Sequence, residues 1–551
     1  MKIFQNTIVG IFAFFTLTSI GFAQKKSYSW DNLPKAVRPK FKADTFNIVN
    51  FGASMGGFKL NTKSINKAII TCSQKGGGVV LVPPGLWLTG PIVLKSKVNL
   101  HISRSALLQF TADKDQYQLV EGNFEGRKTV RNESPISGTD LMDIAITGEG
   151  TIDAHGEVWR AMGKDRVTET QWKQLNTTGV LSADGKTWYP SASYAKGAGK
   201  ADTNTVRKSL KDFKDIKDFL RPNMLVLTNC KRVLLQNTTF QNSPAWCLHT
   251  LMCENLTFDG VRVRNLPNAQ NGDGMDIESC SYVKVENCTL DCGDDGICIK
   301  SGKDQEGRQR GKASQYIVIQ NNVVYEAHGG FVIGSEMSGG AHDIFVSKCT
   351  FIGTDNGLRF KTARGRGGIV ENIFIRDIYM RDIGHDAILF DMYYFAKAPT
   401  LAQTNGKVEI PATNEGTPQF RKFYINNLVC DGAMRGMLIR GLPEMSIKDI
   451  FLENVSIRSQ HGADIVDAQN INLKNVTLDC IDTRPLFNIE NSRQLTFEQV
   501  VSITPAELFF SFNGDRCKDI FVKGGNMTGA KSQTDYNYGA QKSILSIGKL
   551  R

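Results

Sequence analysis

Short apolar stretches recur from about Leu225 onward, and each is followed by a polar turn that contains asparagine. The copies lie at 233–240, 261–265, 283–290, 317–324, 344–351, 373–380, 450–457 and 471–478. Their spacing of roughly 21 to 34 residues is typical of repeat architectures. Strands this short cannot bury an apolar face alone, so stacked coils must create the core. The pattern predicts an all-β protein, a single-stranded right-handed parallel β-helix whose bends use asparagine because it tolerates the left-handed conformation.

The region before these repeats has the same strand character with one exception. Short strands are expected at 79–82, 92–94, 98–102 and 144–146. Apolar residues at helical spacing predict one helix over 61–73, and the glycines at 76–78 would end it. We therefore expect one β-helix domain over 44–551. Two polar stretches, 163–218 and 397–419, interrupt the rhythm and are expected to be long loops, which are often functional.

The N-terminus has the pattern of a secretory signal. Met1 and Lys2 precede an apolar stretch at 8–15, and Gly21-Phe22-Ala23 resembles a cleavage site. We expect a signal peptide at 1–23, a basic lead at 24–43, and export to the periplasm or the outside. A membrane anchor is the alternative, but the apolar stretch is shorter than the roughly 20 residues that span a bilayer. No membrane anchor is therefore expected.

The net charge of the chain indicates which class of molecule it binds. The formal net charge of +11 favours a polyanion. Nucleic acid is the usual first hypothesis, but for an exported protein an acidic polysaccharide is the better one, so no nucleic-acid partner is expected.

The 12 cysteines do not have the paired spacing of a zinc-binding motif. We expect mostly buried thiols, with one or two disulfide bridges that the sequence does not assign, and a monomeric protein.

Acidic and basic residues recur at the coil spacing. Asp273 precedes the pair Asp294 and Asp295 by 21 or 22 residues, which is one repeat. His328 follows one long coil later, and the stretch 359–361 about one coil after that. Because adjacent coils lie about 4.8 Å apart, these residues can share one face of the solenoid.

Strand alternation supports this grouping and also raises a difficulty. In 358–361 it places Arg359 and Lys361 on one face and Phe360 on the other. Asp294 and Asp295 are adjacent, so a regular strand would send them to opposite faces. We expect the segment to bend there, because the flanking Gly293 and Gly296 permit unusual backbone angles.

Crowded carboxylates beside two cations suit glycoside hydrolysis. Like charges raise at least one carboxyl pKa and leave an acid next to a base, and this reaction uses such a pair. Arg359 and Lys361 could bind the carboxylate of a uronic acid sugar. Each feature alone has a plainer interpretation: Asp273 as a turn, Asp294-Asp295 as a calcium site, His328 as a structural histidine. Their common register favours the joint interpretation.

The same residues resemble the motifs of glycoside hydrolase family 28, the polygalacturonase family. Its Asn-Thr-Asp, Gly-Asp-Asp, Gly-His-Gly and Arg-Ile-Lys correspond to 271–273, 293–295, 327–329 and 359–361. The similarity covers about 44–394, including Gly148 to Asp153 and Trp159. Gly272, Ala327 and Phe360 depart from the motifs, and none of them removes a group that does chemistry.

The resemblance implies a pectin-lyase-like β-helix that hydrolyses α-1,4-galacturonosyl linkages with inversion, without metal or cofactor. It implies that Asp294 is the general acid, that Asp273 and Asp295 activate water, and that His328 supports Asp294. It assigns substrate binding to these residues: Asn271, Arg359, Lys361 and Tyr394, with Tyr393 as the alternative to Tyr394. An inverting enzyme should separate acid and base by roughly 6.5–9.5 Å.

Three questions stay open at this level. A pectate lyase would share the fold and the acidic substrate but would need calcium and a base that abstracts a proton. A non-catalytic carbohydrate-binding β-helix would bind without turnover. If the protein is a hydrolase, we expect exo action, because the two long loops could close one end of the cleft.

Overall fold

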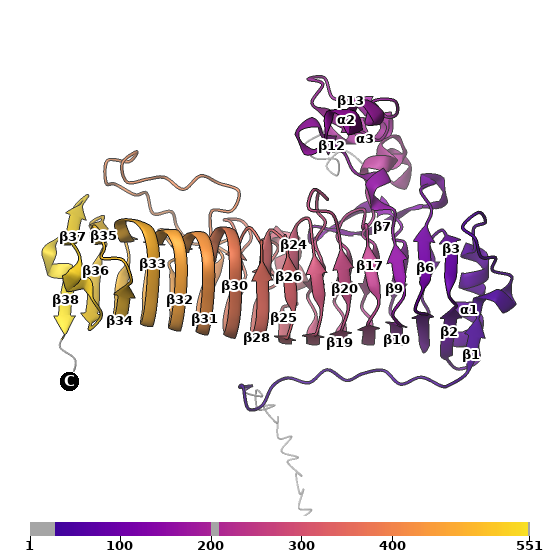
Figure 1. The fold of residues 1–551 in the computed structure, drawn as a ribbon, viewed down its shortest axis with the longest axis horizontal. Coiled ribbons are helices and arrows are strands. Elements are labelled where there is room, and N and C mark those ends of the chain that lie inside the picture. Colours follow the sequence, from indigo (N-terminus) through magenta and orange to yellow (C-terminus); the bar gives the residue numbers. More distant parts are fainter. Residues whose placement is uncertain (1–27, 200–208, 549–551) are drawn as a thin grey trace, which may run out of the picture. The chain divides into compact units, whose positions relative to one another are not determined.

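The computed structural model describes residues 28–199 and 209–548, so the expected signal peptide lies outside the described residues. The chain divides into a short unit up to Leu33 and a large unit from Pro34 onward. The large unit is the β-helix shown in Figure 1, and the expected right-handed parallel β-helix is confirmed. In the part of the chain that the structure describes, no helix has the length and apolar character of a membrane span.

Three columns of parallel strands build the β-helix, and one of them, the site column, bears the predicted motifs. Its strands are β4 (Ile92–Val93), β9 (Ile136–Thr139), β15 (Leu225–Thr228), β18 (Leu248–Leu251), β21 (Met275–Glu278), β24 (Asp295–Lys300), β27 (Gly329–Ile333) and β29 (Leu358–Lys361). It continues through the last parts of β30 (Ile369–Asp391), β31 (Gln419–Arg440), β32 (Ile447–Val466) and β33 (Ala468–Glu490), and then through β35 (Leu508–Asn513) and β37 (Ser532–Asn537).

The other two columns close each coil. One contains β1 (Thr45–Asn47), β2 (Gly78–Val82), β5 (Val98–Ile102), β10 (Met142–Thr147), β16 (Lys231–Gln236), β19 (Glu254–Asp259), β22 (Ser281–Glu286), β25 (Ser314–Gln320), β28 (Ala341–Ile352), β34 (Arg493–Ser502), β36 (Lys518–Lys523) and β38 (Leu545–Gly548). The other contains β3 (Gly85–Thr89), β6 (Ala106–Phe110), β11 (Thr151–Asp153), β17 (Thr239–Gln241), β20 (Arg262–Arg264), β23 (Thr289–Asp291) and β26 (Val323–Tyr325). In the longer strands from β28 to β33, one strand runs through more than one column.

The bends and the core follow the chemistry expected from the sequence. Asn237, Asn287 and Asn321 have φ between 56° and 60°, so asparagine does supply the left-handed bends. Phe360 is fully buried and its ring centroid lies 4.6 Å from that of Phe390 in the next coil. The helix expected over 61–73 is α1 (Thr62–Gln74), which packs its apolar face against the first coils.

The cysteine prediction is partly wrong. All twelve cysteines are buried and free, so the expected one or two disulfide bridges are absent from the structure. Most of them face the interior of the β-helix, where a thiol packs as a small apolar group.

Two segments rise beside the site column on its N-terminal side (Figure 1). The first segment, 162–199, contains a small three-stranded sheet of β12 (Met162–Gly163), β13 (Val180–Leu181) and β14 (Thr187–Tyr189), with α2 (Glu169–Leu175) and α3 (Ala192–Ala198), where the sequence predicted a loop. The second segment is a hairpin of β7 (Leu119–Phe124) and β8 (Arg127–Asn132), which the sequence analysis missed. Its tip reaches α4 (Asp304–Arg310), where Arg127 forms an ion pair with Asp304.

Candidate active site

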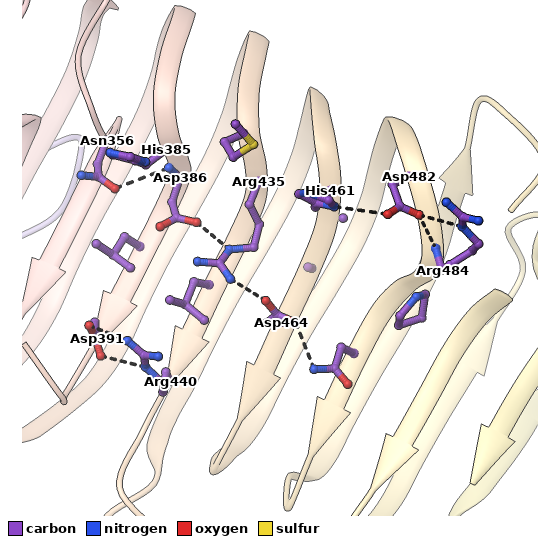
Figure 2. A pocket seen from close by; sticks show the side chains of 17 residues that line it. Asn356, His385, Asp386, Asp391, Arg435, Arg440, His461, Asp464, Asp482 and Arg484 are labelled. Atoms are coloured by element: carbon purple, nitrogen blue, oxygen red, sulfur yellow. Dashed lines mark hydrogen bonds and ion pairs between the residues drawn. The ribbon is translucent and has the colours of Figure 1, made fainter. Parts of the chain in front are cut away.

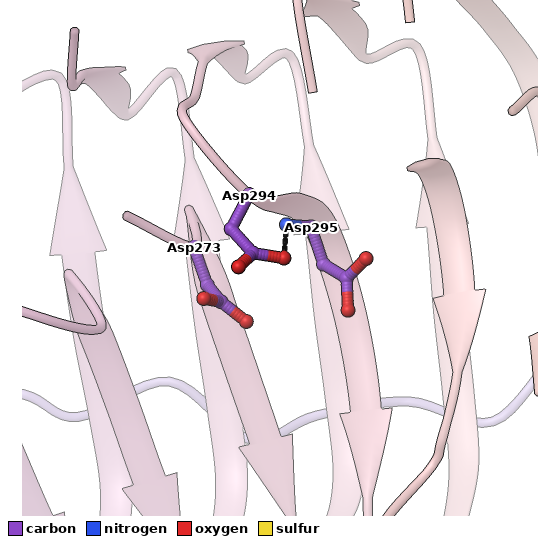
Figure 3. Close-up of side chains that lie close together, drawn as sticks. All are labelled: Asp273, Asp294 and Asp295. Atoms are coloured by element: carbon purple, nitrogen blue, oxygen red, sulfur yellow. Dashed lines mark hydrogen bonds between the residues drawn. The ribbon is translucent and has the colours of Figure 1, made fainter. Parts of the chain in front are cut away.

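Coil register brings the three predicted aspartates together. Met275 pairs with Ile297 across β21 and β24, and the Gly274 N–H donates to the Asp295 carbonyl at 2.9 Å. Asp273 therefore lies beside Asp295 on adjacent coils. Each of Asp273, Asp294 and Asp295 offers a carboxylate oxygen within 4.8 Å of the other two (Figure 3).

Asp294 and Asp295 share a face because Asp294 lies in the turn before β24, outside the strand. Its Oδ1 accepts a hydrogen bond from the Asp295 backbone N–H at 2.9 Å. The expected reason for the flanking glycines was wrong, since neither Gly293 nor Gly296 has a positive φ. Glycine is required because no larger residue fits at either position. A Cβ at Gly293 would lie 2.4 Å from the Leu266 carbonyl oxygen, and one at Gly296 would lie 2.5 Å from Val324.

Asp295 is held as an anion. It is 1% exposed, and its two oxygens accept from Arg359 Nη1 at 2.8 Å and Lys361 Nζ at 2.7 Å. Burial alone would raise the pKa of this carboxyl, but Lys361 and Arg359 outweigh burial and hold it well below its ordinary range. Asp295 is therefore ionised when substrate binds, so it is available as a base and unsuited to supply a proton.

Asp273 has the opposite electrostatic environment. Burial raises its pKa well above the ordinary value, and the neighbouring Asp276 and Asp294 add to that rise. Lys300, 3.8 Å away, opposes it. In the free enzyme Asp273 therefore tends to carry a proton, so the two aspartates that the sequence grouped together as water-activating are electrostatically unlike.

The sequence analysis missed a buried network of ion pairs beside the aspartates, which is centred on Lys300. Lys300 is 4% exposed; its Nζ lies 3.4 Å from Asp276 and 3.3 Å from Glu336, and 4.6 Å from the centre of the Trp246 ring. Burial raises the pKa of Asp276 to about 7. Lys300 thus balances the charge of several carboxylates, including Asp273. The sequence did contain a pattern that could have predicted this network, because Asp276 and Lys300 are separated by about one repeat.

His328 contacts Asp294 as predicted. Its Nδ1 lies 3.0 Å from Asp294 Oδ1, and its Nε2 lies 3.8 Å from Asp355, a residue not singled out before. The hydrogen bond with Asp294 raises the pKa of His328 above its ordinary value. Asn356 fixes the backbone here by donating to the His328 carbonyl at 3.0 Å.

Tyr394, rather than Tyr393, lies at the two cations. Its ring centre is 4.8 Å from Lys361 Nζ and 5.7 Å from the Arg359 guanidinium carbon. Tyr393 is buried and lies beside Arg364. Asn271 lies two residues before Asp273 in the chain, and its Oδ1 accepts a hydrogen bond from Arg221 Nη2 at 2.8 Å.

One coil spacing and one tight turn bring the three aspartates together, so that one oxygen of each lies within 4.8 Å of the others. This distance joins their nearer oxygens, whereas the expected separation of roughly 6.5–9.5 Å refers to whole carboxyl groups. A water molecule that bridges two such oxygens would still lie about 2.8 Å from each, which is hydrogen-bond distance. The cluster therefore has room for one attacking water.

The site column continues C-terminally into a cavity of about 630 Å³ (Figure 2). Leu389, Leu438 and Asp464 lie in register with Arg359 on the next three coils. The guanidinium groups that line this cavity are largely matched by carboxylates: Arg435 pairs with Asp386 and Asp464, and Arg440 pairs with Asp391. This cavity on the coils after the aspartates therefore adds no net positive charge.

Carboxylates of unlike pKa, flanked by cations in one groove of a parallel β-helix, define a polysaccharide-cleaving enzyme. Residues 128–414, just over half of the chain, match the family model of glycosyl hydrolases family 28. The chain therefore belongs to this family and is a glycoside hydrolase.

Relatives and solved structures agree with this assignment. A probable polygalacturonase from Vitis vinifera is 26% identical over 433 residues, covering 76% of this chain and 74% of the relative. An exo-poly-alpha-D-galacturonosidase from Dickeya chrysanthemi is 26% identical over 445 residues, covering 78% and 70%. The structure of a hyperthermoactive exopolygalacturonase from Thermotoga maritima superposes with a TM-score of 0.68 at 29% identity, covering 81% of this chain and 94% of that one.

Proposed function

We propose that this glycoside hydrolase cleaves α-1,4-galacturonosyl linkages in pectic polysaccharide or oligogalacturonides, with inversion at the anomeric carbon. The observation that carries the proposal is the common register of three aspartates with Arg359 and Lys361. The names of the relatives support the same substrate. The expected signal sequence at 1–23 supports export, where a polymer too large to enter a cell can be reached.

Asp294 is the proposed general acid. Its protonated carboxyl gives a proton to the glycosidic oxygen as the bond to the anomeric carbon breaks. Water attacks that carbon from the other face of the ring and loses a proton to Asp295, whose carboxylate is ionised until then and releases the proton to solvent once the product has left. Asp273 orients the same water by a hydrogen bond. His328, 3.0 Å from Asp294, supplies the proton that returns Asp294 to its acid form.

Arg359, Lys361 and Tyr394 are the proposed contacts to one sugar. The two cations already bind Asp295 through one nitrogen each, and Arg359 Nε has no hydrogen-bond partner among the described residues. A uronate carboxylate could share these donors, and the Tyr394 ring could stack on the sugar face. Asn271 would act through its neighbour Asp273.

Exo action is part of the proposal. The β7–β8 hairpin extends from the first coils to α4, and the Lys303 N–H donates to the Gly126 carbonyl at its tip. Together with the described parts of the segment 163–218 it stands on the N-terminal side of the aspartates, whereas the other expected loop, 397–419, rises over the later coils (Figure 1). An obstruction at one end favours binding of a chain terminus. The C-terminal cavity offers space for further sugars of the polymer.

The direct test is a digest of polygalacturonate with and without a chelator. We expect new reducing ends, no new near-ultraviolet absorbance, equal rates in both samples, and monomer or dimer as the early product. A calcium ion at Asp294-Asp295 would face two cations, Arg359 and Lys361, which is why chelation should have no effect. An absorbing, chelator-sensitive product would instead identify a lyase, and early intermediate oligomers would exclude exo action.

His328→Gln should lower kcat/KM about 10²-fold at pH 6. The wild-type pKa of this histidine is raised above about 6.5, so the protonated form persists into neutral solution and is lost as pH rises through the raised pKa. We therefore expect the wild-type alkaline limb of kcat/KM to lie above pH 6.5, and the variant to lack that limb. An unchanged pH profile in the variant would contradict the role of His328 as proton donor.

A further inference from the structure

Three arginines without carboxylate partners gather on the N-terminal side of the aspartates. This arginine cluster consists of Arg131 on β8, Arg160, and Arg221, which precedes β15. Arg160 is 4% exposed and Arg221 is 5% exposed. Within 28–199 and 209–548, none of the three has an acidic oxygen within 4.0 Å, and the nearby Glu125 pairs with Lys303 at 3.3 Å.

Arginines on later coils are paired with carboxylates. The half-buried Arg359 and Arg440 bind Asp295 and Asp391, and the buried Arg366, in the loop after β29, binds Asp304. Uncompensated buried charge is unfavourable, so a protein normally places a carboxylate beside it. In the cluster, burial lowers the pKa of Arg131 to about 9, and repulsion from Arg221 adds to that effect. The cluster therefore differs from the paired arginines on the later coils.

Hydrogen bonds do not explain all three residues. Arg221 donates to the carbonyl oxygens of Pro244 and Gln270 at 2.9 and 2.7 Å, and Arg160 donates to the Ser243 carbonyl. These bonds hold the loops beside Asp273, but carbonyl groups do not neutralise the charge. Arg131 holds no loop in this way, because its Nε and Nη2 are buried and have no hydrogen-bond partner among the described residues.

Aromatic contacts connect the cluster to the active site. The Arg131 guanidinium lies 3.7 Å from the centre of the Phe124 ring, and Phe124 stacks on Trp246 with centroids 5.5 Å apart. Trp246 is the ring that Lys300 approaches. Arg221 reaches the aspartates through Asn271. The cluster is thus the N-terminal counterpart of Arg359 and Lys361, with the aspartates between the two groups of cations.

We propose that the arginine cluster binds the carboxylate of a second uronate, on the opposite side of the cleaved bond from the sugar held by Arg359 and Lys361. Arg131, the one member of the cluster that is only partly buried, supplies the guanidinium group that meets the carboxylate, and Arg160 and Arg221 supply the surrounding positive charge. The inference rests on the proposed function, since the anion is a group of the same substrate. It makes the enzyme require a free acid on both sides of the bond.

The test uses the shortest oligogalacturonide that the wild type cleaves, and two derivatives with one methyl ester, on either sugar flanking the cleaved bond. The wild type should lose about 10- to 100-fold in kcat/KM with either ester, the equivalent of a charge-assisted hydrogen bond. Arg131→Met should become indifferent to one ester and stay sensitive to the other. Lys361→Met should show the reverse.

Thermal unfolding without substrate separates binding from structure. Arg131→Met should keep or raise Tm, because it removes an uncompensated charge, whereas a structural arginine would lower it. Lys128→Met is the matched control: it removes the same charge from the same strand, and Lys128 is exposed, so both ester effects should persist. Undiminished sensitivity of Arg131→Met to both esters would overturn the inference, whatever its Tm.

A binding experiment distinguishes failure of the proposed hydrolase function from failure of the proposed carboxylate site. Titration of an oligogalacturonide and its two single methyl esters into Asp294→Asn needs no turnover, so the compounds can be chosen without reference to cleavage. Absence of cleavage by the wild type, together with ester-sensitive binding that Arg131→Met loses, would reject the hydrolase proposal and support the carboxylate site. Ester-insensitive binding would reject the site itself.

Discussion

Asp294→Asn should lower kcat by about 10³-fold or more, with KM and Tm close to those of the wild type. An amide cannot give a proton to the leaving oxygen, and general acid catalysis contributes about 10²- to 10⁴-fold. The change is nearly isosteric, and the amide oxygen can still accept the Asp295 N–H. Steady-state kinetics on oligogalacturonides and a melting curve measure the two expectations.

The matched control is Asp343→Asn. Asp343 also forms an aspartate–histidine pair, with His342 Nδ1 at 2.8 Å, but it lies on β28 in another column. Its kcat should equal that of the wild type. A loss in Asp294→Asn no larger than in Asp343→Asn would contradict the assignment of the general acid. A lowered Tm in Asp294→Asn would assign part of the loss to folding.

Lys300→Met should lower both stability and activity. Removing one partner from a buried ion network leaves unpaired charges and costs about 3–5 kcal/mol in the free energy of unfolding. Asp276 and Glu336 would lose their ion pair with Lys300. The pKa of Asp273 would rise further, because the cation that opposes its rise is gone, so kcat should fall at least tenfold. Denaturant unfolding and kinetics at one pH measure both.

A second substitution tests whether charge is the cause. Lys300→Met combined with Glu336→Gln removes one of the unpaired carboxylates and should recover part of the lost stability, although not the activity. Lys474→Met is the control, because Lys474 forms an ion pair with Glu453 at 2.7 Å on the exposed surface, where such pairs contribute little. Equal stability of Lys300→Met and Lys474→Met would refute the role of Lys300.

The electrostatic division between the aspartates refines the chemistry implied by the family motifs. Motif order alone groups Asp273 with Asp295. The structure places Asp295 against two cations and Asp273 against other carboxylates. One therefore stays ionised while the other tends to hold a proton, and Asp295 becomes the better candidate for the base. The difference arises from residues on other coils, such as Asp276 and Lys361, which no local motif contains.

The sequence by itself determined the repeating architecture and the members of the catalytic group. A short apolar strand, an asparagine bend and a second strand can bury their apolar side chains only by stacking, so periodicity alone predicts the β-helix. Coil spacing then places Asp273 beside Asp294 and Asp295, and alternation places Phe360 in the core, as observed.

Only the tertiary structure decided what surrounds that group. The Lys300 network and the arginine cluster join segments far apart in the chain, and their meaning lies in which charges have a partner after folding. The hairpin that carries Arg131 could not be placed from its own pattern, because its position depends on contacts with α4. Register within a coil is local and periodic, whereas burial and pairing of charge depend on the whole packed chain.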